Sequence, residues 1–177
     1  MESVGEGFGF ACAGCGAYHV GMPAFGWDWP VQYLMVPEGE RAARVELSSD
    51  TCVIDGRWFF ARGCLEIPVR GHGEPLSWGV WVSLSEQNFR AYATLFDDAS
   101  REPGTRFVGW LCSVVPGYPD TQQLAAALHV RSWPTRPFIE LEPTDHPLAA
   151  EQREGISSDR VREIAERVMH PPHDAQP

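Results

Sequence analysis

The residue types that could do chemistry are concentrated near the start of the chain, where Cys12 and Cys15 form a C-x-x-C turn. Such a turn can direct two thiolates at one metal ion, and Gly16, directly after the second cysteine, eases the tight backbone curve. Structural zinc takes four thiolate or imidazole ligands. We therefore expect zinc at this turn, with His19 as a third ligand and Cys52 as a fourth.

Two other interpretations of the turn stay open. Strong zinc-ribbon sequences carry two C-x-x-C turns and this chain has one, so Cys12 and Cys15 can instead be reduced structural cysteines. Redox C-x-x-C motifs open a helix after a core strand, whereas residues 17–20 lead here into a loop rich in Gly and Pro, which disfavours a redox role. Cys64 and Cys112 lie in apolar stretches, and we expect them to be buried as small hydrophobic side chains.

A second candidate site is the acidic cluster formed by Glu140, Glu142, Asp145 and His146. Two carboxylates on one face of a strand, followed by an aspartate and a histidine where a helix begins, could perform general acid–base chemistry or hold a hard metal ion. On this interpretation Glu142, Asp145 and His146 are the catalytic residues of a hydrolase. The structural alternative is that Thr144 or Asp145 caps the helix, while His146 and the two glutamates join a hydrogen-bond network with Arg62, Arg136 or Arg153.

The charge of the chain argues against several classes of function. Its 177 residues include 14 basic residues, all of them arginine, and 24 acidic residues, and the net charge is −10. Without lysine there is no Schiff-base chemistry, and an acidic surface repels a phosphate backbone, so we expect no nucleic-acid partner. Neither a glycine-rich phosphate loop nor a Gly-x-Ser-x-Gly nucleophile turn is visible in the sequence.

The sequence also carries no pattern typical of export or of a membrane. The first residues are acidic and no long apolar run follows them, which argues against a signal peptide, a membrane-spanning helix and a membrane partner. We therefore expect a cytoplasmic protein. In that compartment its five cysteines should be thiols or metal ligands rather than disulfides.

The length and composition of the chain indicate a single α+β domain over residues 1–170, followed by a disordered tail over 171–177. Strands dominate the middle of the chain and do not alternate with helices in a regular β-α-β rhythm. We therefore expect a mostly antiparallel sheet with several short helices, and a zinc-knuckle turn at the amino-terminal end.

Two stretches carry the clearest strand signals. Residues 51–61 read as a hairpin, because Asp55 and Gly56 readily supply the positive φ angles of a two-residue turn. In residues 78–84 the alternating apolar side chains share one face, and Trp81 lies on the other face, so we expect both faces to be covered.

Helices are expected where a capping residue precedes an apolar stripe. A helix after Ser85 has its apolar residues at helical spacing. Further helices are expected over residues 37–47, over 120–128, from Pro147 to Gly155, and from Ser157 or Ser158 to the residue before Pro171.

Four segments of the chain, residues 49–55, 59–68, 78–85 and 139–152, are similar to the bacterial domain-of-unknown-function family numbered 2199 (DUF2199). The resemblance covers nearly the whole chain, from about the C-x-x-C turn to the last helix. It implies a single-domain bacterial cytoplasmic protein. Because the family has no assigned reaction, the resemblance supplies no catalytic residue.

These observations favour a zinc-stabilised binding or regulatory module without catalytic activity, whose partner is a protein or a small molecule. Trp27 and Trp29 lie in a loop and are the side chains we expect to meet a protein partner. The alternative is the hydrolase built on the acidic cluster.

Overall fold

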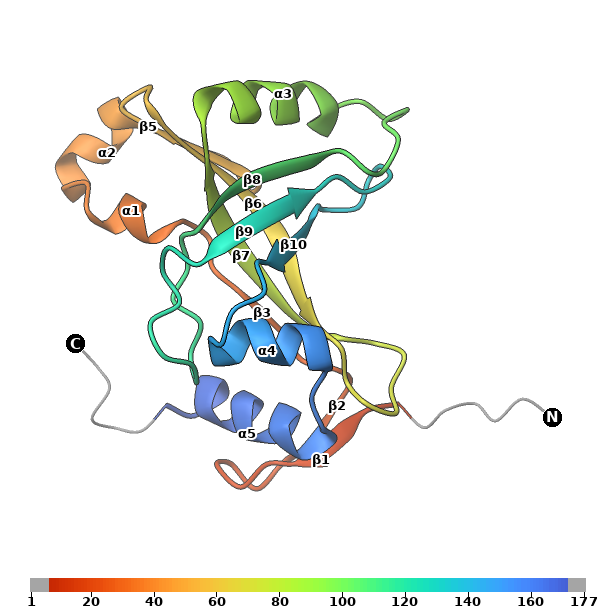
Figure 1. Ribbon diagram of the computed structural model, residues 1–177. Coiled ribbons are helices and arrows are strands. Elements are labelled where there is room, and N and C mark those ends of the chain that lie inside the picture. Colours follow the sequence, from red (N-terminus) through yellow and green to blue (C-terminus); the bar gives the residue numbers. More distant parts are fainter. Residues whose placement is uncertain (1–6, 172–177) are drawn as a thin grey trace.

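The centre of the structure, a computed structural model that describes residues 7–171, is a closed barrel of five strands. The barrel strands are β6 (Trp58–Ile67), β7 (Leu76–Leu84), β8 (Arg106–Leu111), β9 (Ala125–His129) and β10 (Phe138–Leu141). Strands β7, β8, β9, β10 and β6 pair in that order, and β6 pairs back with β7, which closes the sheet (Figure 1). The predicted tail falls, apart from Pro171, outside the described residues.

Shorter strands extend the barrel and a small hairpin lies beside it. They are β1 (Gly9–Ala11), β2 (Tyr18–Val20), β3 (Ala24–Gly26), β4 (Val45–Leu47) and β5 (Thr51–Ile54). Strands β5 and β4 continue the sheet beyond β6, β3 pairs with the first half of β7, and β1 pairs only with β2 among the described strands. The helices of the described chain are α1 (Val31–Leu34), α2 (Glu38–Arg44), α3 (Glu86–Phe96), α4 (Pro147–Glu154) and α5 (Ser158–Met169).

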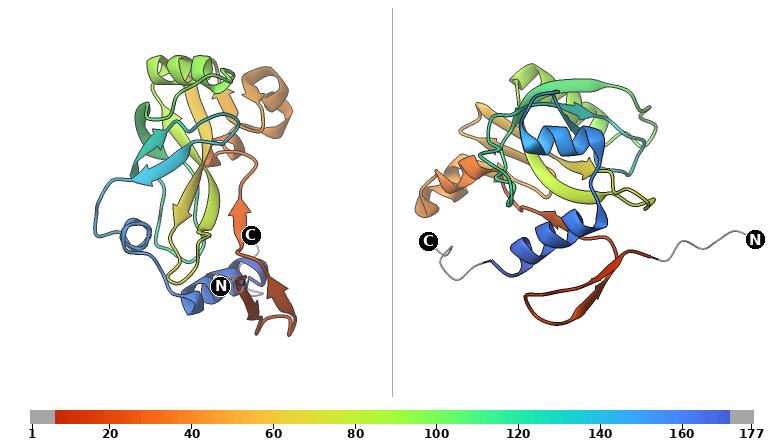
Figure 2. Two further views of the ribbon diagram at one scale, coloured as in Figure 1. Left: turned by 90° about the vertical axis from the view of Figure 1, so that its right-hand side faces the viewer. Right: turned by 60° about the horizontal axis from the view of Figure 1, so that its bottom comes forward.

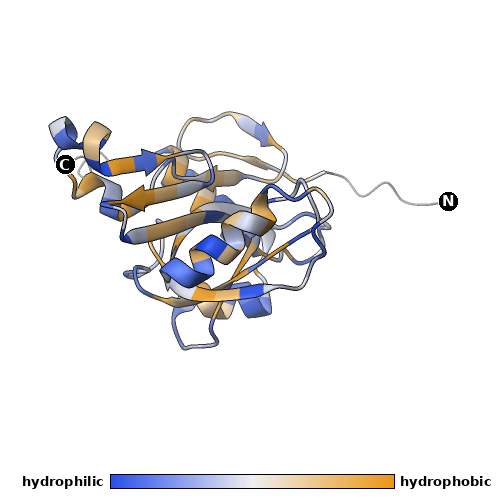
Figure 3. Cartoon of the chain, turned by 90° about the horizontal axis from the view of Figure 1, so that it is seen from above, coloured by the Kyte–Doolittle hydropathy of each residue, from blue (hydrophilic) through white to orange (hydrophobic). Residues whose placement is uncertain are grey.

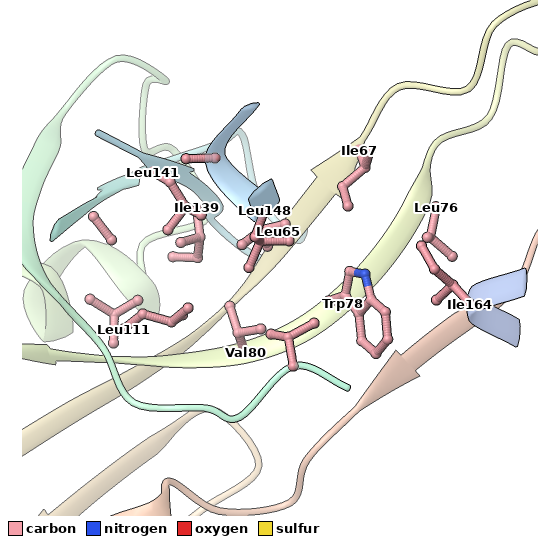
Figure 4. Close-up of a cluster of buried hydrophobic side chains, with 14 of the residues drawn as sticks. Leu65, Ile67, Leu76, Trp78, Val80, Leu111, Ile139, Leu141, Leu148 and Ile164 are labelled. Atoms are coloured by element: carbon pink, nitrogen blue, oxygen red, sulfur yellow. The ribbon is translucent and has the colours of Figure 1, made fainter. Parts of the chain in front are cut away.

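The core of the barrel is built by the alternation of side chains along β6 and β7. These strands pair antiparallel from Phe59 opposite Leu84 to Ile67 opposite Leu76. Every second residue therefore points into the barrel, and the long hydrophobic stretches of the strands are visible in Figure 3. The inward side chains meet residues from the other barrel strands, α4 and α5, among them Leu111, Ile139, Leu148 and Ile164 (Figure 4).

The ends of the barrel are covered by helices. Helix α3 lies across one end, where Tyr92 is buried with its ring 6.2 Å from that of Phe107. Helices α4 and α5 lie at the opposite end, and the β1–β2 hairpin lies beside α5 (Figures 1 and 2). The first and last elements of the described chain thus meet at one end of the molecule.

The predicted fold class is right in its mixed α and β content and partly right in its sheet. Most strand pairings are antiparallel, but β10 pairs in parallel with β6, and β3 pairs in parallel with β7. The closure of the sheet into a barrel was not predicted, because it depends on the long-range pairing of β10 with β6.

Two local predictions on strands are confirmed. The hairpin of β5 and β6 turns at Asp55 and Gly56, which have φ angles of 55° and 61°, although its connection also includes Arg57 and is therefore one residue longer than expected. Trp78 lies in the main core, whereas Trp81 lies in a second apolar cluster on the outer face of the same strand. Both faces of β7 are therefore covered.

The helices are predicted well at three places, in part at one and wrongly at one. The helix expected over residues 37–47 is α2, which ends at Arg44, and residues 45–47 form β4 instead. Ser85, His146 and Ser157 precede α3, α4 and α5, and each side chain accepts a hydrogen bond from the first turn of its helix. The helix predicted over 120–128 is wrong, since this stretch leads into β9, a buried barrel strand. Alanine favours helices intrinsically, and the pairing with β8 and β10 overrides that preference.

Gly109 permits the close approach of β8 to β7, and its replacement tests the barrel. A Cβ atom at this position would lie 2.0 Å from the backbone oxygen of Ser83. We expect Gly109→Ala to lower the free energy of unfolding by at least about 2 kcal/mol, because backbone atoms would have to move. The matched control is Gly39→Ala in α2, where a Cβ meets nothing within 4 Å and stability should rise by about 0.5–1 kcal/mol. Urea denaturation measures both, and equal stabilities for the two variants would contradict the closed pairing.

Candidate metal centre

The C-x-x-C turn is the loop of the β1–β2 hairpin. The strands pair antiparallel up to Ala11 opposite Tyr18, so the cysteines fall in the connection. The backbone N–H of Cys12 donates to the oxygen of Ala17 over 2.9 Å, and that of Gly16 donates to the oxygen of Cys12 over 2.9 Å. Gly16 has a φ of 73°, a conformation that suits glycine.

The hairpin brings His19 to the cysteines. His19 lies opposite Phe10 in the strand pair, and the two rings stack with their centroids 5.2 Å apart. Phe10 is buried in the main core and therefore orients the imidazole. The Nε2 atom of His19 is 3.4 Å from the Sγ atom of Cys15.

A fourth side chain comes from the other end of the described chain. His170 is the residue directly after α5, and its backbone N–H donates to the oxygen of Glu166. The Glu166 carboxylate accepts a hydrogen bond of 2.7 Å from the backbone N–H of Ala13, which ties the last turn of α5 to the C-x-x-C loop. Gly14 leaves room for the imidazole, because a Cβ there would lie 2.6 Å from the Cδ2 atom of His170.

These four side chains form a group that could hold a metal ion. One ligand atom from each of Cys12, Cys15, His19 and His170 lies within 4.8 Å of all the others. A tetrahedral zinc with Zn–S of about 2.3 Å and Zn–N of about 2.0 Å separates its ligand atoms by roughly 3.3–3.8 Å, so a small contraction would complete the site. The Nε2 atom of His170 is shielded from solvent and has no hydrogen-bond partner, which is costly for a polar atom unless it binds something.

The structure does not bring Cys52, the expected fourth ligand, to this group. Cys52 lies on β5 in the second apolar cluster, together with Phe60 and Trp81, and its side chain is fully buried. Burial raises the pKa of its thiol to about 12, which makes the thiolate that a metal needs harder to form. His170 takes the fourth place. Sequence reasoning missed it because a single histidine at a helix end has no motif around it.

A scan against protein-family models finds a match over residues 11–156 to the family described as "Uncharacterized protein conserved in bacteria (DUF2199)". The chain belongs to this family. No curated protein matches, and no solved structure matches.

Three of the four ligand candidates lie inside the DUF2199 segment. Cys12, Cys15 and His19 fall within residues 11–156, whereas His170 follows that segment.

No helix among residues 7–171 combines the length and the apolar character that crossing a membrane requires.

The predicted catalytic residues of the acidic cluster do not converge on a site. Glu142 pairs with Arg106 over 2.6 Å, and Glu140 contacts the Nε2 atom of His129 over 2.8 Å. His146 caps α4 with its Nδ1 atom, which accepts from the backbone N–H of Leu148 over 3.2 Å.

Asp145 is exposed, and no cavity described for the chain is lined by it together with His146. The two glutamates are thus engaged in ion pairs and His146 in a cap, roles of the kind that the structural alternative describes. The cap is His146 instead of Thr144 or Asp145. The partners of the glutamates are Arg106 and His129 instead of the arginines expected from the sequence.

Gly14→Ala tests whether His170 is a ligand, since the added methyl group would displace the imidazole. We expect the affinity for zinc to fall about 10–100-fold, a range typical of disturbed ligand support, with little change in the stability of the metal-free protein. Competition with a chelating dye measures the affinity. Gly73→Ala is the control, because a Cβ there meets nothing within 4 Å. Wild-type affinity in Gly14→Ala would remove His170 from the site.

Proposed function

We propose that this protein is a zinc-stabilised binding module of the bacterial cytoplasm, without catalytic activity, in which the metal joins the first hairpin to the last helix. The observation that carries the proposal is the approach of two cysteines and two histidines to within 4.8 Å of one another. Two thiolates and two imidazoles are a ligand set that zinc favours in structural sites.

A structural role for the metal follows from the number of protein ligands. A catalytic zinc keeps one position for water or substrate, whereas four protein ligands fill the tetrahedron. The group also links elements that are far apart in sequence. Three ligands lie in the β1–β2 hairpin, between residues 12 and 19, and the fourth, His170, follows α5. A metal that bridges them restricts the unfolded chain and contributes its binding free energy to folding.

The binding role is supported by a cavity on the opposite side of the fold. It measures about 500 Å³ and lies between α1, α2 and the outer face of strands β5 to β8. That size is typical of pockets for small molecules. With a net charge of −10, a small molecule or a protein is a better partner than a nucleic acid.

A cytoplasmic location belongs to the same proposal. All five cysteines are free thiols, among them the two at the metal site. Thiolate ligands must stay reduced in order to bind zinc, and a reducing compartment keeps them so.

The zinc content of the purified protein tests the metal directly. We expect one zinc per chain by elemental analysis of protein prepared without added metal. Cys15→Ser and His170→Ala should lose that zinc. With zinc at about a thousandfold over its Kd, the metal stabilises the fold by about 4 kcal/mol, so these variants should melt about 8–16 °C lower.

Cys52→Ala is the matched control for the ligand set. It removes a buried thiol outside the group and should keep one zinc per chain, although the lost packing lowers its stability. Full zinc content in His170→Ala, or loss of zinc in Cys52→Ala, would contradict the proposed ligands.

A further inference from the structure

The cavity beside α1 and α2 is formed by the outer face of the sheet. Phe60 lies opposite Ser83 in the β6–β7 pair, and Ser83 lies opposite Trp110 in the β7–β8 pair. Because paired residues share a face, these three side chains form a row across three strands, and all three line the cavity.

The cavity has aromatic walls that are open to solvent. Trp58 and Trp110 are 54% and 55% exposed, and both line it together with the buried ring of Phe60. Met35, directly after α1, is 77% exposed and belongs to the wall of the cavity that the helices form. Large apolar side chains so exposed around one hollow are typical of a ligand site and favour a flat, apolar occupant.

The charges at the rim of the cavity neutralise each other. Arg44 donates to both carboxylate oxygens of Asp55, over 2.7 and 2.8 Å, and to Glu40 over 2.6 Å. Within the described lining, Arg44 and Asp55 are the charged residues, and each has the other as partner. An uncharged ligand therefore fits better than an anion or a cation.

One polar atom in the lining lacks a partner. The Oε1 atom of Gln32 is shielded from solvent and accepts no hydrogen bond among the described residues. The orientation of this amide follows from its neighbour Cys112. The single thiol hydrogen of Cys112 is donated to the oxygen of Trp110 over 3.4 Å, so its sulfur can only accept, and the Nε2 atom of Gln32 donates to it over 3.5 Å. The carbonyl oxygen of the amide is thus an acceptor without a donor at the wall of the cavity, and a donor on the ligand reaches it once the Gln32 side chain turns toward the cavity.

We propose that this cavity binds a small, planar, uncharged ring compound that packs against Trp58 and Trp110 and donates one N–H or O–H to Gln32 Oε1. This proposal rests on the proposed function, because it specifies the class of ligand that the binding module takes. It does not depend on the metal.

Binding is tested with indole, a planar uncharged ring with a single N–H donor, added to the zinc-loaded full chain. Two-dimensional ¹H–¹⁵N spectra should show saturable shifts at the indole N–H groups of Trp58 and Trp110. Benzofuran has the same shape and lacks the donor, so it should bind about fivefold more weakly, the effect of one hydrogen bond. Indole-3-carboxylate should bind at least about tenfold more weakly, because Arg44, the cation of the described lining, is already paired with Asp55 and Glu40.

Variants assign the two contacts separately. Gln32→Leu keeps the side-chain size and should abolish the preference for indole over benzofuran. Trp110→Ala should weaken both probes about tenfold through the lost ring contact. Trp133→Ala is the matched control, because Trp133 is 53% exposed and does not line the cavity; it should leave both affinities unchanged.

Any of four results would overturn the inference. Three concern the probes: no saturable shift with indole at millimolar concentration, equal affinity for indole and benzofuran in the wild type, or tighter binding of the carboxylate. The fourth is a self-associated protein that Trp110→Ala converts to a monomer, since a second copy would then occupy the face. The zinc site is tested separately, by zinc content and melting temperature. A failure of ligand binding in this cavity would therefore leave the metal proposal standing.

Discussion

The pairing of β6 with β7 determines which side chains form the barrel core and which form its outer face. Nine residue pairs, from Phe59 opposite Leu84 to Ile67 opposite Leu76, fix which side chains face the barrel and which face away. A slip of one residue would reverse both faces of the pair. The same register therefore sets the inward core and the outward row on which α1 and α2 leave a cavity.

The second constraint is the position of α5, which holds His170 beside the C-x-x-C turn. Arg160 on α5 donates to the carboxylate of Glu151 on α4 over 2.9 Å, and the hydroxyl of Tyr118 donates to the same carboxylate. Burial raises the pKa of Tyr118, and the adjacent carboxylate of Glu151 raises it further, so the phenol stays a donor. These contacts fix α5 without a metal, and the ligand group is thus largely formed before an ion arrives.

The sequence predicts what is decided locally and fails where distant segments meet. Asp55 and Gly56 define a hairpin turn by their own backbone preferences, and the two cysteines of the C-x-x-C turn lie within one loop. The strand that includes Ala127 was predicted as a helix because its alanine-rich sequence favours a helix and does not show the pairing with β8 and β10 that makes it a strand. For the same reason the fourth ligand position was assigned to Cys52 instead of His170: ligand spacing along the chain does not show that the last helix returns to the first hairpin.

X-ray absorption at the zinc edge reports the atoms around the metal in solution and therefore tests the ligand set of the zinc site. We expect two sulfur ligands at about 2.3 Å and two imidazole nitrogens at about 2.0–2.1 Å, with no bound water. His170→Ala, which should bind no zinc as purified, is loaded with excess zinc for the same measurement, and its metal should then have one imidazole nitrogen instead of two, which would identify the ligand from α5. An oxygen ligand or more than two sulfur ligands in the wild type would contradict this ligand set. A zinc environment that is unchanged in His170→Ala would contradict it as well.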